Sequence, residues 1–221
     1  MKRIVIITIW AIAFGFVEAS VVEYLRAIYY PLSSGGFQFP MLTLDLIHEM
    51  GFEHNQRLQI EVVRELCTLI MLATVSMAAA QNRREAWAYF MITFGVWDIS
   101  YYVWLKIFLG WPTGVMAWDL LFLIPVPWVA PVIAPVVISI ALIASGLTVL
   151  YFEERKEPLE LEWKSWILIV AGGIVVIMAF CWDYQNIVAG GFPQPFQWVV
   201  FLVGLGISAT TFLLGVFRRL I

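Results

Sequence analysis

The chain has 221 residues, of which 62% are hydrophobic and only 13% are charged. Soluble domains are roughly half apolar and about a quarter charged, so this composition excludes an ordinary water-soluble domain. The formal net charge of −3 provides no basic surplus of the kind that nucleic-acid-binding proteins carry, and we expect no nucleic-acid partner.

Long apolar stretches recur in the first half of the chain and predict membrane-spanning helices. The first stretch covers about residues 4–29 and stops before Pro31. A loop leads from it into an amphipathic outer segment at about residues 41–56. Two further spans are predicted at about 57–80 and 86–109, and the second of them ends at the sequence GWP.

The second half of the chain continues in the same way. Residues 113–125 predict a short interfacial stretch, which leads into a fourth span at about 128–151. A polar linker precedes the last two spans, at about 165–182 and 198–217. Since a helix of about 20 residues crosses a hydrocarbon core of roughly 30 Å, each of the six stretches is long enough to span a membrane.

These stretches define the expected fold class. Their apolar character is continuous rather than alternating, which favours helices over a closed β-barrel. We therefore expect an all-α, polytopic transmembrane helix bundle with six spans. Residues 1–221 form a single integral membrane domain in this interpretation, and its first partner is the lipid bilayer.

The basic residues predict the orientation of the bundle. With six spans, nine of the 13 Lys and Arg fall on one side, namely Lys2, Arg3, Arg83, Arg84, Arg155, Lys156, Lys164, Arg218 and Arg219. Cytoplasmic loops are enriched in Lys and Arg, so both termini are predicted to be cytoplasmic in a multi-pass protein of the cell membrane. The alternative is that the first 19 residues are a cleaved signal peptide, which leaves five spans and the same C-terminal orientation.

Several charged residues are predicted to share one layer of the bundle. At about 1.5 Å of rise per residue, Glu18 lies roughly 21 Å above the cytoplasmic face, and Asp98 and Glu65 lie roughly 18 Å above it. The second span carries a polar stripe at helical spacing, formed by His54, Arg57, Glu61, Arg64, Glu65 and Thr68. Such a stripe cannot face lipid, since each central charge would cost several kcal/mol.

Acids outnumber bases in this layer. Arg64 is the one base predicted at that depth, whereas Arg26, Arg57 and Lys106 are placed nearer the rim. Buried carboxylates in excess must take up protons, admit water or bind a cation. The predicted ligand-binding or ion-pair cluster is Glu18, Glu23, Glu61, Arg64, Glu65, Asp98, Tyr101 and Tyr102. The alternative is an ion-pair network that only holds the helices together.

The outer segment adds candidate metal ligands. It contains His48 and ends near His54, the two histidines of the chain, and these could join Glu65 and Asp98 around a divalent metal. The alternative without a metal is an acidic amphipathic helix on the outer membrane surface. The sequence predicts neither haem nor a nucleotide cofactor, because neither histidine lies deep in a span and no phosphate-binding loop is present.

Three classes of function follow from these patterns. The first is an outward-facing buried pocket that binds a small ligand, protons or a cation, with or without catalysis. The second is a non-catalytic subunit or assembly partner of a larger membrane complex, with other membrane subunits as partners. The third is a proton- or cation-coupled transporter, which the absence of charge within the cytoplasmic half of the spans disfavours.

Overall fold

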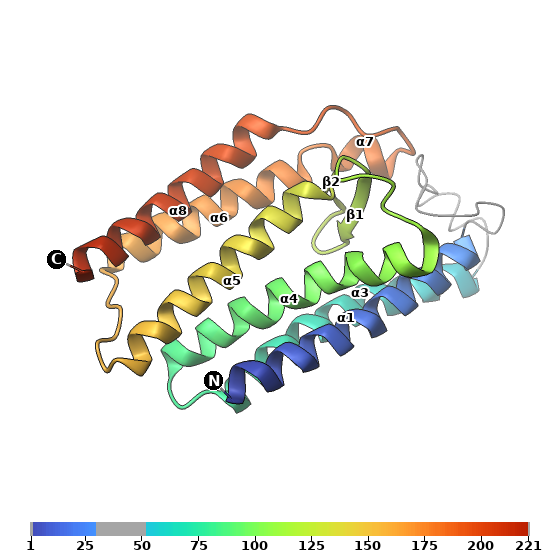
Figure 1. Ribbon diagram of the computed structural model, residues 1–221. Helices are drawn as coiled ribbons and strands as arrows, with labels where there is room; N and C mark the ends of the chain where they lie inside the picture. Colours follow the sequence, from blue (N-terminus) through green and yellow to red (C-terminus); the bar gives the residue numbers. More distant parts are fainter. Residues whose placement is uncertain (1, 30–51, 221) are drawn as a thin grey trace.

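The structure is a computed structural model that describes residues 2–29 and 52–220. Long helices dominate this part of the chain: α1 (Lys2–Tyr29), α3 (Phe52–Ala79), α4 (Arg83–Leu109), α5 (Ile133–Glu154), α6 (Trp163–Cys181) and α8 (Trp198–Leu220). A hairpin of two strands, β1 (Trp118–Phe122) and β2 (Trp128–Pro131), lies between α4 and α5, and a short helix, α7 (Tyr184–Val188), follows α6 (Figure 1).

Five of these helices are long and apolar enough to cross a membrane, namely α1, α3, α5, α6 and α8. The prediction of a predominantly helical membrane protein is confirmed to that extent. Helix α4 has 27 residues, a sufficient length, but Asp98 and the tyrosines in its middle lower its hydropathy. It corresponds to the third predicted span.

Helix α4 lies at the centre of one layer of the bundle. It packs against α1, α3 and α5, whereas α6 and α8 pack against each other. Figure 1 shows that both ends of the chain lie at one end of the bundle and that the hairpin lies toward the other end. The hairpin and the two helix layers therefore surround the space in which the buried charges of the chain meet.

Local sequence determines where α4 begins and ends. The Asn82 side chain accepts a hydrogen bond from the Glu85 backbone N–H at 3.0 Å, which caps the helix start. At the other end Gly110 adopts a left-handed φ of 66°, and its N–H bonds the Lys106 carbonyl at 3.1 Å. Glycine adopts this conformation without steric cost, so the helix stops directly before the Trp-Pro sequence.

The connection between α4 and α5 differs from the prediction. Residues 113–125 were expected at the interface and span four was expected from Trp128, but β1 and β2 form an antiparallel hairpin and α5 begins at Ile133. Asp119 pairs with Ala130 and Leu120 pairs with Val129, with a bulge before Phe122. The pairing of the two strands satisfies the backbone groups that face each other, so the hairpin needs outside partners only for its outer edges.

Small residues allow α6 and α8 to approach closely. A Cβ atom added to Gly204 would lie 2.7 Å from the Gly172 carbonyl oxygen, and one added to Gly172 would lie 2.6 Å from the Gly204 carbonyl. The Ser208 hydroxyl donates to the Ile169 carbonyl at 3.0 Å across the same contact. This pair of helices is thus held by backbone contact, as is common in membranes.

Candidate functional site

A cavity of about 630 Å³ lies between the two helix layers. Its walls come from α4 and α5 on one side and from α6 and α8 on the other, and they are mainly apolar. At the hairpin end the walls also carry charged and polar residues, namely Glu18, Arg26, Glu61, Arg64, Glu65 and Asp119. The volume falls within the usual range for small-molecule sites, about 300–1,000 Å³.

Arg64 joins α1 and α3 at this end of the cavity. Its Nη1 atom lies 2.5 Å from Oε2 of Glu18. Its Nε and Nη2 atoms donate to the two carboxylate oxygens of Glu61 at 2.8 and 2.5 Å, which is a bidentate pair. Thr68 donates to Glu18 at 3.4 Å. Because Glu61, Arg64 and Thr68 are spaced by three and four residues, one face of α3 presents all three.

This group contains Glu61, Arg64 and Thr68 of the predicted polar stripe, together with Glu18 of α1. Glu18 is buried, and Arg64 is the base that neutralises it. With Glu61 also ionised, the three side chains carry a formal charge of −1. Such a network is costly to disrupt, because removal of the arginine leaves two carboxylates in a poorly solvated place.

Glu65 connects the same helix to the hairpin. Its Oε2 atom accepts a hydrogen bond from the Leu123 backbone N–H at 2.9 Å. Leu123 directly follows β1, so the carboxylate satisfies a backbone donor that the hairpin pairing leaves open. Glu65 is buried and lines the cavity, yet its interaction is with the backbone and not with Asp98.

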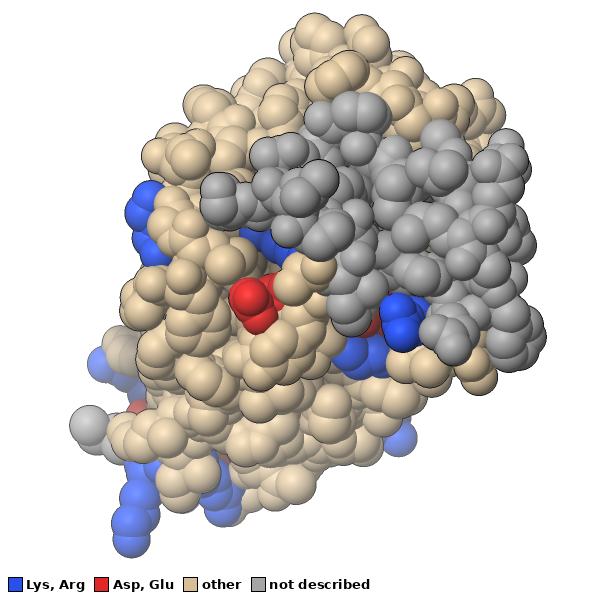
Figure 2. Space-filling model, turned by 90° about the vertical axis from the view of Figure 1, so that its right-hand side faces the viewer, with Lys and Arg blue, Asp and Glu red and all other residues tan. Residues whose placement is uncertain are grey.

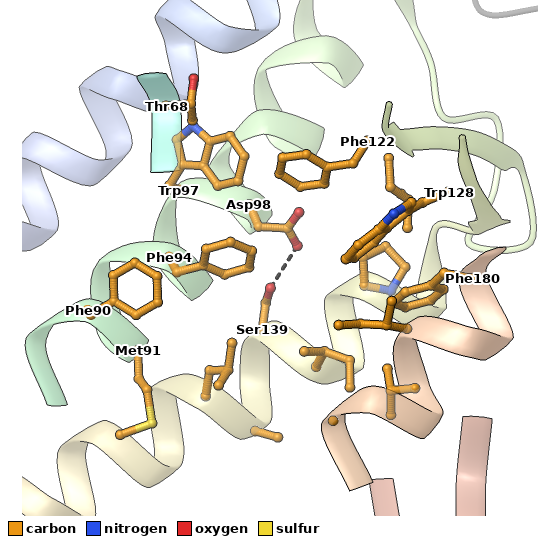
Figure 3. A pocket seen from close by; sticks show the side chains of 18 of the residues that line it. Thr68, Phe90, Met91, Phe94, Trp97, Asp98, Phe122, Trp128, Ser139 and Phe180 are labelled. Atoms are coloured by element: carbon orange, nitrogen blue, oxygen red, sulfur yellow. Dashed lines mark hydrogen bonds between the residues drawn. The ribbon is translucent and has the colours of Figure 1, made fainter. Parts of the chain in front are cut away.

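Asp98 lies farther along the cavity, on α4. Its Oδ2 atom accepts a hydrogen bond from the Ser139 hydroxyl of α5 at 2.7 Å. Figure 3 shows the carboxylate below the Trp97 and Phe122 rings, between Phe94 on one side and Trp128 on the other. Within the described part of the chain, no hydrogen bond joins Asp98 to Glu18 or Glu65. The acids predicted as one cluster therefore line one cavity at separate places.

A second buried ion pair lies beside the cavity, between Arg26 of α1 and Asp119 of β1. Their Nη2 and Oδ1 atoms are 3.5 Å apart, and Asp119 is only 1% exposed. The Arg26 guanidinium also lies over the Trp111 ring, 4.1 Å from its centroid, a cation–π geometry. Burial raises the pKa of Asp119 to about 6, and the charge of Arg26 opposes that shift.

This pair corrects the sequence analysis, which placed Arg26 near the rim and omitted Asp119. The signal that could have found Asp119 is an isolated acid within a strand-like apolar stretch, preceded by a tryptophan as Asp98 is. Arg26 lies against Asp119 of the hairpin and over the Trp111 ring, and both contacts shield it from solvent. Arg26 is consequently buried.

The two predicted tyrosines also reach this region. Tyr101 and Tyr102 line the cavity together with Asp119, and their rings are 4.9 Å apart. Glu23 was part of the predicted cluster, but it is not among the described residues that line the cavity.

Two of the four predicted metal ligands, the histidines, have side chains outside the described part of the structure. His48 lies outside the described residues, and the side chain of His54 does too, although His54 belongs to α3. Among residues 2–29 and 52–220, no three His, Cys, Asp or Glu side chains are grouped as a metal site requires. Glu65 and Asp98 have other partners, as described above.

Charged side chains are exposed in places at the hairpin end. Figure 2 views this end and shows acidic and basic side chains close to one another among uncharged described residues. The site thus consists of an arginine with two glutamates, a buried Arg26–Asp119 pair and an Asp98–Ser139 pair around an apolar cavity.

Comparisons with protein-family models, with curated proteins and with solved structures found no match, so the site has to be interpreted from its own chemistry.

Proposed function

We propose that this chain is a multi-pass cell-membrane protein whose cavity binds a small amphiphilic molecule at an outward-facing charged end. The observation that carries the proposal is the continuity of one cavity, from Glu18 and Arg64 at the hairpin end to the apolar walls between α5 and α6. Buried charge beside apolar walls is costly, whereas a molecule with a polar head and an apolar body contacts both kinds of wall favourably.

The topology belongs to the same proposal. Helix α4 serves as the sixth span, since it lies among α1, α3 and α5 and its acid faces the interior of the protein. Both termini are cytoplasmic in this proposal, because the end of the bundle that holds them carries more Lys and Arg residues than the opposite end. Their side chains make ion pairs there, such as Arg84 with Glu153 at 2.5 Å and Arg3 with Glu85 at 3.7 Å.

A reporter fused after Ile221 tests this topology. We expect a fluorescent protein that matures only in the cytosol to be bright, and a phosphatase that is active only outside the cytosol to be inactive. Fusions placed in the loop after α6, for example after Gly190, should give the opposite pattern. A phosphatase signal at the C-terminus would place the charged end of the cavity in the cytoplasm and overturn the outward-facing assignment.

The distribution of buried charge supports binding over transport. The charged residues that are buried in the described part of the chain, Glu18, Arg26, Glu65 and Asp119, all lie in the half near the hairpin. In the other half, the buried Ser76 and Thr93 hydroxyls bond each other at 2.9 Å. A transport path needs polar groups on both sides of the midplane, and this pair is satisfied within the protein.

Filling the cavity tests the binding function. Gly173 lines the cavity, and a Cβ atom added there meets nothing within 4 Å. We expect Gly173→Phe to leave the fold intact and to block the binding of a tritiated C12 alcohol that carries a photoreactive diazirine. The readout is saturable labelling of cavity-lining peptides in maltoside micelles, resolved by mass spectrometry.

Gly206 provides the matched control. It is an exposed glycine of α8 outside the cavity, and a Cβ atom added there also meets nothing within 4 Å. Gly206→Phe should therefore leave saturable labelling unchanged. Equal labelling in both variants and in the unmodified protein, or labelling that excess unlabelled alcohol does not reduce, would mean that the cavity binds no such molecule.

A further inference from the structure

We propose that the ligand carries a positively charged organic group, an ammonium with an apolar chain, and that Asp98 and the surrounding aromatic rings bind this group. The inference rests on the proposed binding function and adds the charge and the place of the ligand's head. Three observations support it: the surroundings of Asp98 contain no paired base, aromatic rings form the adjacent wall, and the donor set does not suit a bare metal ion.

The charge balance around Asp98 is negative. Its one hydrogen-bond partner in the described part of the chain is the neutral hydroxyl of Ser139. Asp119, a second acid that lines the same cavity, is already paired with Arg26. Arg64 is engaged by Glu18 and Glu61 and also donates to the Thr68 hydroxyl. A cationic ligand would therefore supply the counter-charge that this carboxylate lacks.

Aromatic rings from α4, the hairpin and α6 form a continuous arc around the part of the cavity that Asp98 lines. The Phe94 and Trp97 centroids are 5.5 Å apart, and those of Trp97 and Phe122 are 6.5 Å apart. The arc continues from Phe122 to Trp128 at 5.6 Å and from Trp128 to Phe180 at 6.0 Å. Figure 3 shows Asp98 projecting toward the space that these rings border.

A carboxylate bordered by several aromatic rings is selective for organic cations. Aromatic faces attract a desolvated ammonium group, and quaternary ammonium ligands are commonly held by several rings at once. Small metal ions instead require about six oxygen ligands, and Asp98 with Ser139 offers far fewer. An anionic head would be repelled by Asp98, whereas the charge of Asp119 is balanced by Arg26. The apolar walls farther along the cavity, from α6 and α8, then accommodate the chain of the molecule.

The test is competition against the photoreactive alcohol in maltoside micelles. Unlabelled dodecyltrimethylammonium is expected to reduce the cavity labelling at a concentration about tenfold or more below that of dodecanol. In Asp98→Asn this advantage should disappear while labelling by the alcohol itself persists. Glu160→Gln, the same chemical change at an exposed linker residue, should behave as the unmodified protein.

A second variant keeps the test decisive if Asp98→Asn does not fold. Trp128→Leu removes a ring but no charge, and we expect it to weaken competition by the ammonium compound several-fold more than competition by dodecanol. Equal competition by the two compounds in the unmodified protein would overturn the ammonium assignment and leave amphiphile binding intact. Absence of any saturable labelling would instead overturn both the proposed function and this inference.

Discussion

Replacement of Arg64 by alanine is expected to lower the free energy of unfolding by about 3–5 kcal/mol, the usual cost of removing one partner from a buried charge network. Arg64 bonds Glu18 and both carboxylate oxygens of Glu61, and without it two acids remain in a poorly solvated site. The measurement is thermal or denaturant-induced unfolding of the purified protein in detergent.

Arg218→Ala is the matched control. Arg218 also pairs with a glutamate, Glu162, at 3.1 Å, but their side chains are 69% and 66% exposed. Exposed pairs contribute at most about 1 kcal/mol, so this variant should be close to the unmodified protein. Adding Glu18→Gln and Glu61→Gln to Arg64→Ala should recover much of the loss, since no unpaired charge remains. Similar stabilities of Arg64→Ala and Arg218→Ala would show that the network contributes little.

Most of the helices could be predicted from the sequence, because the apolar stretches are long and short polar segments separate them. The ends of α4 illustrate this, since Asn82 and Gly110 act locally through one hydrogen bond each. The hairpin could not be predicted in the same way. Residues 118–131 are apolar and rich in prolines, and their strand pairing depends on contacts with helices that are distant in sequence.

The charged site was predictable where a single helix determines it. Glu61, Arg64 and Thr68 share a face because of the helical period, and the common depth of Glu18 in another span brings it to Arg64. Depth alone, however, does not determine the rotation of a helix about its axis. The Asp98 carboxylate accepts its hydrogen bond from Ser139 of α5 and not from a group on α1 or α3, so a prediction from depth alone did not find its partner.

Arg26→Ala is expected to have the next largest effect, again a loss of about 3–5 kcal/mol at pH 8. Arg26 and Asp119 are both buried and 3.5 Å apart, and the guanidinium also stacks on Trp111. Without the arginine, Asp119 is a buried carboxylate whose main counter-charge is gone. Adding Asp119→Asn should restore part of the stability, because an amide is not charged.

The pH dependence distinguishes lost electrostatics from lost packing. The pKa of Asp119 is already raised to about 6 in the folded protein, compared with about 3.9 for an unfolded aspartate, and removal of Arg26 raises it further. The unfolded state therefore releases this proton at a lower pH than the folded state does. As a result, the contribution of Asp119 to the free energy of unfolding is greatest below about pH 4. It falls as the pH rises through the pKa of the folded state. The stability deficit of Arg26→Ala should consequently be smaller at pH 5 than at pH 8, and the Asp119→Asn double variant should lose this dependence. A deficit of the same size at both pH values would assign the role of Arg26 to its packing on Trp111.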